Sequence, residues 1–300
     1  YLSKRDDNLI VYDKLTYAGN KENFKSLRNN HRFKFIKGDI TNQDKLTKVF
    51  FEYKPLVVIN FAAETHVDNS IEHPNSFIVT NIVGTFTLLN VIRKYYGILK
   101  LNEKNKFVFL NISTDEVFGS LHLSSRSSNE NSPFMPNSPY SASKASADHL
   151  VRSYYKTYNI PSITTHCSNN FGPYQNEEKL IPKIIKNALK WNKIPIYGKG
   201  KNIRDWIFVE DHCTAIIKIF ESGHVGETYN IGGGKEISNI NLVKLICKKL
   251  NVIHPNKNGS YESLIRFVKD RAGHDFRYSI DSNKLINSLG WKVSKTFDQS

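Results

Sequence analysis

Two adjacent carboxylates, Asp115 and Glu116, follow Thr114 in the stretch NISTDEVFGS, directly after the apolar run KFVFL. Two neighbouring carboxyl groups in a site that holds little water cannot easily both ionise, so one pKa rises and an acid coexists with a base. These residues are therefore suited to acid–base chemistry. A pair of solvated loop acids is the alternative, and the stretch alone does not decide between the two.

Tyr140 and Lys144 form a second candidate pair, in the stretch SPYSASKASADHL. They are four residues apart, so they would share one face of a helix. A nearby ammonium favours the phenolate, which would lower the pKa of Tyr140 from about 10 and make it a general base for a hydroxyl whose carbon gives up hydride. The spacing also occurs on ordinary helix surfaces. Its position after the strand end that carries Ser113 and Thr114 favours catalysis.

These candidates need a fold that brings strand ends together. The first half of the chain alternates strand patterns with helical ones, the strands at 8–13, 33–39, 56–63, 106–113 and 162–169 and the helices at 45–53, 83–96 and 143–158. This alternation predicts an α/β fold with a doubly wound, parallel Rossmann sheet, in which ligands bind beyond the carboxyl ends of the strands. After about residue 168, short strands and a helix at 241–250 predict a smaller α/β lobe.

Composition excludes several classes of protein. The 300 residues are 39% hydrophobic, enough for one large domain or two interlocked ones. Cys167, Cys213 and Cys247 are far apart, which predicts neither a disulfide framework nor a metal site and favours a cytoplasmic location. No apolar run approaches the about 18–20 residues of a membrane span. The net charge of +14 comes from scattered lysines, which favours a compositional bias over a nucleic-acid surface; a small anionic ligand would also suit a basic cleft.

Three strand ends suit a dinucleotide. Asp13 could bind both hydroxyls of a ribose, which favours NAD over NADP, and Asp39 could meet the adenine amino group. Small residues in NFAAET would let the cofactor approach the backbone. Each acid could instead start a turn or cap a helix. The glycine-rich phosphate fingerprint does not occur, so we expect that the N-terminal strand that carries it and a C-terminal segment are missing; a protein that no longer binds dinucleotide is the alternative.

Over nearly its whole length the sequence resembles the extended short-chain dehydrogenase/reductases of the NAD-dependent epimerase/dehydratase type and, within them, the dTDP-glucose 4,6-dehydratases. Nine stretches in the same order carry this resemblance: DKLTYAGN, FAAETHVDNSI, TNIVGTFTLL, ISTDEVFG, SPYSASKASADHLV, SNNFGPYQNEEKLIP, PIYGKGKNIRDWIFVEDH, GETYNIGGGKEISN and DRAGHDFRY.

The resemblance implies a hydro-lyase that converts dTDP-glucose to dTDP-4-keto-6-deoxyglucose in deoxysugar (rhamnose-type) biosynthesis. Tyr140, with Lys144 and Thr114, would take the O4 proton while hydride leaves C4 for NAD. Glu116 would remove the C5 proton and Asp115 would protonate the departing C6 hydroxyl. Hydride would then return to C6.

The same resemblance implies where the ligands bind. NAD would contact residues around the first four strand ends, namely Asp13, Lys14, Leu15, Thr16, Gly19, Asn20, Asp39, Ile40, Phe61, Ala62, Ala63, Thr80, Ser113, Tyr140, Lys144 and Asn170. The nucleotide sugar would contact Thr65, His66, Thr114, Asn169, Lys179, Pro195, Ile196, Tyr197, Arg204, Asn239, Arg271 and His274. Residues 1–168 would form the NAD-binding domain, with 203–220 packing back onto it, and 169–300 mainly the nucleotide-sugar lobe.

The chain departs from the family pattern at three positions, where Thr65 replaces Ser, Asn69 replaces Arg and Ala272 replaces Pro. Asn69 calls a local ion pair into question. The resemblance also implies a homodimer formed through a helical face. Three alternatives stay open: a nucleotide-sugar 4-epimerase, which has no use for an Asp–Glu pair; a GDP- or CDP-sugar 4,6-dehydratase; and a non-catalytic Rossmann module that binds NAD(H) or nucleic acid.

Overall fold

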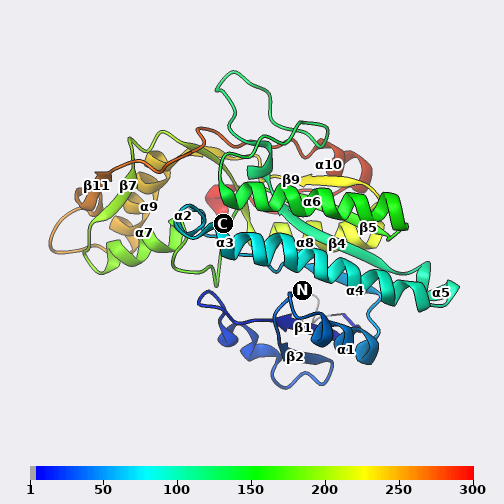
Figure 1. Ribbon diagram of the computed structural model, residues 1–300. Coiled ribbons are helices and arrows are strands. Elements are labelled where there is room, and N and C mark those ends of the chain that lie inside the picture. Colours follow the sequence, from blue (N-terminus) through cyan, green and yellow to red (C-terminus); the bar gives the residue numbers. More distant parts are fainter. Residues whose placement is uncertain (1–4) are drawn as a thin grey trace.

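Parallel strands form the centre of the molecule in the computed structural model, which describes residues 5–300 and so leaves out the first four residues of the predicted NAD-binding domain. The main sheet has the order β3 (Val57–Asn60), β4 (Val108–Thr114), β5 (Ser162–Cys167) and β9 (Thr228–Ile231) (Figure 1). β1 (Leu9–Asp13) and β2 (Phe33–Lys37) form a separate parallel pair. The predicted α/β fold with a parallel sheet is confirmed.

Helices cover both faces of the main sheet because its strands are apolar on both sides. Along β4, Phe109 packs into a core with α1 (Gln43–Tyr53), α4 (Thr85–Ile98) and α6 (Pro139–Tyr158). Its neighbours Val108 and Leu110 pack into a second core with α8 (Val209–Ser222) and α10 (Asn283–Leu289). Successive residues of a strand point to opposite faces, so the continuous apolar run produces two cores.

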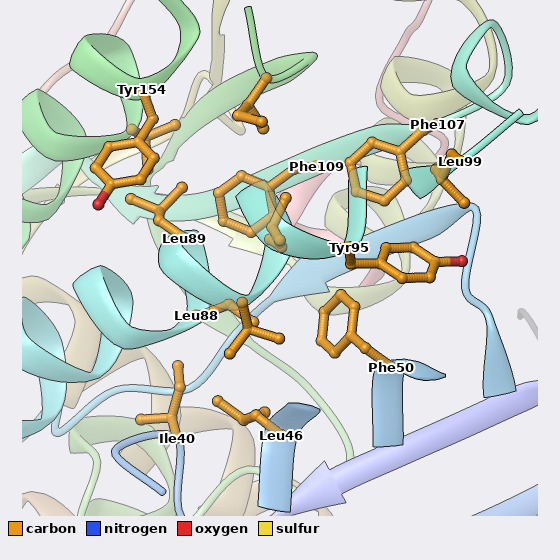
Figure 2. Close-up of a cluster of buried hydrophobic side chains, with 14 residues drawn as sticks. Ile40, Leu46, Phe50, Leu88, Leu89, Tyr95, Leu99, Phe107, Phe109 and Tyr154 are labelled. Atoms are coloured by element: carbon orange, nitrogen blue, oxygen red, sulfur yellow. The ribbon is translucent and has the colours of Figure 1, made fainter. Parts of the chain in front are cut away.

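Figure 2 shows the first of these cores, in which aromatic side chains meet between α1, α4 and β4. The rings of Phe50 and Tyr95 lie edge to face, with centroids 5.5 Å apart. Leu89 and Ile92 of α4 are fully buried here. In this core α4 packs against α1 and also against α6, which runs alongside it (Figure 1).

A smaller lobe has a core of its own. It contains α7 (Leu180–Leu189), α9 (Asn239–Ile253), η5 (Tyr261–Leu264) and the parallel pair β7 (Ile194–Tyr197) and β11 (Ile265–Val268). Another sheet, of three strands, joins β6 (Asn169–Phe171), β8 (Ile203–Phe208) and β10 (Glu236–Ser238). The chain after residue 168 thus enters both parts of the molecule, because α8, β9 and α10 pack on the main sheet.

Short elements complete the chain between these strands and helices. They are η2 (Lys21–Leu27), α2 (Val67–Glu72), α3 (Pro74–Phe77), the π-helix η3 (Ile78–Gly84), α5 (Leu101–Lys104), η4 (Asp115–Phe118) and η6 (Phe297–Gln299). The polar segment at 122–138 forms an irregular loop with an isolated bridge from Ser128 to Ile280.

The ends of α6 are set by local chemistry. Ser138 precedes the helix, and its hydroxyl accepts from the backbone N–H of Ser141 at 3.1 Å, while Pro139 occupies the first helical position. Both features satisfy or remove backbone donors that a helix start leaves free. At the other end Asn159 adopts a left-handed φ of 54°, which terminates the helix.

One stretch corrects an expectation from the sequence. Within residues 5–300, the continuous helical segment Pro74–Ile98 is long and apolar enough to cross a membrane, judged by length and composition alone. The expectation that no apolar run is long enough to span a membrane was therefore wrong. Polar residues interrupt this segment, but its mean hydropathy stays high. Core helices meet the same criteria, and half of this segment's most apolar window is buried inside the protein.

We expect Leu89→Ala to lower the free energy of unfolding by about 2–5 kcal/mol, because it removes a fully buried side chain from the core beside β4. Urea denaturation followed by circular dichroism measures this change. Leu101→Ala is the control, since Leu101 is 75% exposed and its truncation should change stability by less than about 0.5 kcal/mol. Equal effects of the two variants would contradict the assigned core.

Candidate active site

The Thr114–Asp115–Glu116 stretch lies where the buried strand β4 ends and η4 begins. The Thr114 hydroxyl accepts from the backbone N–H of Glu116 at 3.3 Å and so caps the short helix. Gly119 closes it with a φ of 76°, and a Cβ there would meet the carbonyl oxygen of Met135. The backbone therefore turns sharply and holds all three side chains at the end of the strand.

Tyr140 lies beside this turn. It is buried in the first turn of α6, and its ring packs edge to face on Phe77 with centroids 6.2 Å apart. Thr114, Glu116 and Asp115 are all close enough to the phenol to affect its pKa. The catalytic residues predicted from two separate stretches thus converge on one site.

The expected lowering of the Tyr140 pKa by Lys144 was wrong. Burial first, and then the charge of Glu116, raise the pKa of Tyr140 well above its usual value of 10.0. Lys144 is not among the groups that shift it, because its Nζ donates to the main-chain carbonyl of Ile112 at 2.7 Å. Burial lowers the pKa of Lys144.

The two acids have unequal surroundings. Burial raises the pKa of Asp115 well above 3.8, and the charges of Glu116 and Asp205 add to the rise. Its Oδ2 has no hydrogen-bond partner among residues 5–300. Burial also raises the pKa of Glu116, but the cations Arg204, Arg271 and Lys179 oppose the rise. Asp115 is therefore suited to hold a proton and Glu116 to accept one, as the adjacency argument predicted.

Two contacts bring the small lobe to this site. Arg271 forms a bidentate ion pair with Asp68, at 2.6 Å from Nε and 3.0 Å from Nη2, and lies over the ring of Tyr197. The Tyr197 hydroxyl donates to the same carboxylate at 3.1 Å. Lys179 donates to both oxygens of Thr65, its carbonyl and its hydroxyl.

Arg204 is buried and already engaged. Its guanidinium donates to the main-chain carbonyls of Ile203 at 2.8 Å and Asp275 at 3.0 Å, and lies 4.2 Å from the centroid of the Tyr278 ring. Arg204 thus ties β8 to the segment that carries Asp275 and Tyr278, while its charge still acts on Glu116.

The other predicted substrate residues surround the same region. The side chain of His66 caps α2, and His274 contacts Asp270 at 2.7 Å. Asn169 and Asn239 each have a buried side-chain oxygen without a partner in the described part of the chain. Pro195 and Ile196 lie in β7 next to Tyr197, Ile196 with its side chain buried.

Most of the predicted cofactor residues lie at or just after the ends of β1 to β4; the others are Thr80 in η3, Tyr140 and Lys144 in α6, and Asn170 in β6. Asp13 is exposed and accepts from the backbone N–H of Leu15, whose φ is 55°. Lys14 bridges to Asp39 at 2.8 Å. The turn that follows closes from Gly19 to Thr16. The remaining positions vary in exposure: Asn20 caps η2, Phe61 and Ala62 are exposed, Ala63 and Thr80 are partly buried, and Ile40 and Ser113 are buried.

These residues fit NAD. An exposed carboxylate follows β1, as ribose recognition requires, and small residues that leave room for a ligand follow β3. The buried Oδ1 of Asn170 has no partner among the residues described here and is available to a ligand amide. No group of three or more His, Cys, Asp or Glu side chains within residues 5–300 could hold a metal ion.

Sequence reasoning missed Tyr278. Its hydroxyl lies 3.4 Å from Oε2 of Glu116 and donates to Oδ2 of Asp275 at 2.5 Å. Asn137 donates to the other oxygen of Asp275 at 2.6 Å. Tyr278 closes the stretch DRAGHDFRY, which sequence analysis used only for Arg271 and His274. An isolated Tyr at a loop end gives no signal of its own.

A parallel sheet with a buried Thr, Tyr and Lys at the carboxyl end of β4 defines an NAD-dependent enzyme of the extended short-chain dehydrogenase/reductase class. The model of the family described as GDP-mannose 4,6 dehydratase matches residues 1–300. The dTDP-glucose 4,6-dehydratase of Xanthomonas campestris pv. campestris is 49% identical over 98% of this chain and 84% of its own length. The dTDP-glucose 4,6-dehydratase 1 of Escherichia coli is 47% identical over 99% and 84%.

Solved structures agree with these relatives. DesIV, a dTDP-glucose 4,6-dehydratase from Streptomyces venezuelae solved with NAD bound, has a TM-score of 0.89 and 39% identity over 99% of this chain and 86% of that one. The enzyme of the same name from Bacillus anthracis, also solved with NAD, has a TM-score of 0.83 and 43% identity over 97% and 84%. The chain belongs to the dTDP-glucose 4,6-dehydratase family, and the predicted family, hydro-lyase class and NAD cofactor are confirmed.

Asn69, which stands where the family usually has Arg, makes a neutral contact instead. Its side-chain amide donates to the Tyr17 hydroxyl at 3.3 Å, and its backbone N–H donates to Nδ1 of His66. The contact joins the loop after β1 to α2, so Asn69 keeps a bridge at this place without an ion pair.

We expect Tyr278→Phe to slow water loss about 10- to 100-fold and to leave substrate oxidation nearly unchanged. The variant removes a hydroxyl next to Glu116, and a hydrogen bond to a charged group contributes about 1.5–3 kcal/mol. Stopped-flow absorbance of NADH, which should accumulate before product forms, measures the two steps. Tyr261→Phe is the matched control, since its buried hydroxyl donates to His254 in the small lobe. Slowed oxidation without NADH accumulation would contradict this assignment.

Proposed function

We propose that this protein converts dTDP-glucose to dTDP-4-keto-6-deoxyglucose in deoxysugar biosynthesis. The observation that carries the proposal is the buried Thr114–Asp115–Glu116 turn beside the phenol of Tyr140. This arrangement combines an alcohol-oxidation set with an adjacent acid and base. The names of the relatives support the sugar nucleotide.

Oxidation at C4 needs a hydroxyl held against a base. Thr114 and Tyr140 lie close together, so a sugar hydroxyl placed between them would contact both oxygens. Bound NAD supplies the hydride acceptor and a positive ring, which favours the phenolate. In this proposal Lys144, fixed on the Ile112 carbonyl, adds its positive charge to that of the bound cofactor. Tyr140 takes the O4 proton as the ketone forms.

Water loss needs an acid and a base on neighbouring atoms of the sugar. The C4 ketone acidifies the C5 hydrogen, and Glu116, whose pKa burial raises, removes it as a carboxylate. Asp115, whose pKa is raised further, stays protonated and delivers its proton to the C6 hydroxyl as water leaves. Hydride would then return to C6 while Glu116 gives its proton back to C5, so that the cofactor and Glu116 would both regain their starting states.

A 4-epimerase is a weaker candidate. It would need Thr114, Tyr140 and Lys144 but has no step for an adjacent acid and base. Asp115 is buried with an unpaired oxygen among the described residues, which costs stability and has no use in epimerisation.

The nucleotide part of the substrate would lie between the lobes. We assign the diphosphate to Arg204, Arg271 and His274, the sugar to Thr65, His66 and Asn169, and the base to the β7 segment from Pro195 to Tyr197, with Lys179 and Asn239 assisting. In this proposal Arg271 exchanges Asp68 for phosphate oxygens, which suit its planar fork. Residues 1–168 hold mainly NAD and residues 169–300 mainly the sugar nucleotide.

A helical face supports a homodimer. Ile78, Val79, Val83 and Phe86, on η3 and α4, are between 41% and 45% exposed and spaced along one segment. Neighbouring exposed apolar side chains of this kind are typical of protein interfaces. We propose that a second copy of the chain covers them, that the enzyme is cytoplasmic, and that it acts on neither membranes nor nucleic acid.

The substrate is tested by turnover. Full-length protein with NAD and dTDP-glucose should give a 4-keto-6-deoxy product, detected by its alkali-induced ultraviolet absorbance. GDP-mannose and CDP-glucose are the comparison substrates. Product from one of these, but none from dTDP-glucose, would overturn the substrate assignment.

We expect Asp115→Asn to slow water loss about 10²–10⁴-fold, the usual contribution of a general acid, while NADH still forms transiently. Turnover unchanged in Asp115→Asn would remove the role of this residue.

For the native enzyme, activity should fall on the acid side at a pH above 4.5, because Glu116 with its raised pKa becomes protonated there and can no longer act as base.

We expect Phe86→Glu to shift the protein from dimer to monomer, because a charge within the apolar face would have to be desolvated. Size-exclusion chromatography with light scattering measures the mass. Leu101→Glu, at an exposed apolar residue of α5, should leave the mass unchanged. A dimer in both variants would place the interface elsewhere.

A further inference from the structure

A buried carboxylate lies next to the catalytic residues and has no role in the steps above. Asp148 is on α6, one helical turn after Lys144, and is 5% exposed. Its oxygens accept from Nδ2 of Asn111 at 2.9 Å and from the hydroxyl of Ser113 at 2.7 Å, and Oδ2 lies 3.1 Å from Nε2 of His166. The partners come from β4 and β5, so this one side chain joins the helix to two strands.

The chain extends from there across the sheet. Asn60, at the end of β3, donates to Oδ1 of Asn111 at 3.1 Å, and Oδ1 of Asn60 accepts from the backbone N–H of Ala62. Asn60 and Asn111 are both buried. Asp148 therefore connects to the predicted cofactor residues at the end of β3 as well as to Ser113.

The negative charge of Asp148 also acts on Lys144. Lys144 is 5% exposed, and burial of its ammonium lowers its pKa. Asp148 is the strongest of the nearby groups that oppose this, ahead of Cys167. Its negative charge therefore favours the protonated form of Lys144.

A second buried contact on α6 helps to distinguish two effects of Asp148, holding the helix in place and supplying a negative charge. Asn81, in the π-helix η3, donates to the hydroxyl of Ser143 at 2.8 Å and to the carbonyl of Glu64 at 3.0 Å. This contact is also buried and also joins α6 to a strand-end loop, but neither Asn81 nor Ser143 carries charge. Loss of either contact should loosen α6, whereas only loss of the Asp148 carboxylate should affect the proton on Lys144.

We propose that Asp148 is a positioning residue for the oxidation step, whose buried carboxylate orients Ser113 and keeps the ammonium of Lys144, one helical turn away, charged and in place on the Ile112 carbonyl. The inference rests on the proposed function for its catalytic meaning. It does not depend on the identity of the sugar, because Ser113 and Lys144 belong to the cofactor side of the site.

Other titratable or charged groups around Asp148 must be considered in any pH experiment. A cavity of about 330 Å³ on the far side of α6 is lined by Asp148 itself and by further ionisable side chains. Apart from Asp148, the ionisable groups that line this cavity are Glu130, His149, Arg152, Tyr155, His166 and Glu227. Lys144 and Cys167 lie close by, since the charges of Asp148 and Cys167 both act on Lys144.

The test uses the Asp148→Asn variant and measures the pKa of Lys144 directly. In the protein without cofactor, the ¹³Cε resonance of Lys144, assigned through Lys144→Arg, is titrated by NMR. We expect the midpoint to fall by about one pH unit or more, since an opposite charge nearby shifts a pKa by this order. With NAD and dTDP-glucose, single-turnover formation of NADH should be at least about 10-fold slower, and its alkaline limb should move to lower pH by a similar amount.

Ser143→Ala is the matched control. It removes the Asn81 contact from the same helix and should lower thermal stability, but the Lys144 midpoint and the alkaline limb should stay within about 0.3 pH units of the native values. Asp148→Ser, also uncharged and with room for a water molecule, is the second variant. Asp148→Glu keeps the charge and should keep the midpoint.

The outcomes separate the hypotheses. A lowered midpoint in a folded uncharged variant, but not in Ser143→Ala, supports the proposal. An unchanged midpoint, or failure of both uncharged variants to fold while Ser143→Ala folds, shows a structural role only and overturns it. Native protein that makes no product from dTDP-glucose would overturn the proposed function instead, while the NMR titration would still decide the role of Asp148.

Discussion

Directional polar contacts between α6 and the carboxyl end of β4 decide where the catalytic side chains lie. Apolar packing alone lets a helix rotate or slide over a sheet at little cost. Here the Lys144–Ile112 and Ser113–Asp148 hydrogen bonds fix the register between the two elements. Both are buried, and a buried polar group left unpaired costs about 1–3 kcal/mol, so small shifts of α6 are strongly disfavoured.

The same burial creates the chemistry and opposes stability. The negative charges of Glu116 and Asp205 act on the buried Asp115, and one oxygen of Asp115 has no hydrogen-bond partner within residues 5–300. Such a group destabilises a fold, and proteins keep it where its raised pKa is used. The pKa of Glu116 is raised less, because the charges of Arg204, Arg271 and Lys179 oppose the effect of burial. Two neighbouring carboxyls thereby differ in proton affinity through their surroundings alone.

The two lobes meet at the site rather than beside it. Asp68 follows the third strand of the chain, and Arg271 comes from a loop two hundred residues later, yet they form a bidentate pair with Tyr197 against both. Lys179 on Thr65 is a second such contact. The cations of the small lobe are thus held near Glu116 before any ligand binds. Their arrangement depends on the packing of β7, β8 and the 270–278 segment together.

Local rules were enough for part of this protein. The apolar runs and their spacing predicted β4 and α6, because side-chain periodicity follows directly from backbone geometry. The same rule placed Tyr140 and Lys144 on one face, and adjacency along the chain predicted unequal acids at Asp115 and Glu116. The nine quoted stretches were enough to predict the family, because their types and order recur in its members.

Tertiary structure decided the rest. It directed Lys144 to a carbonyl instead of towards the Tyr140 phenol, and it brought Tyr278 to Glu116 from the far end of the chain. It returned β9 and α10 to the main sheet and buried half of a helix whose composition suits a membrane. The physical reason is the same in each case: desolvation, long-range charge and hydrogen-bond partners depend on which segments pack together, and spacing along the sequence does not contain that information.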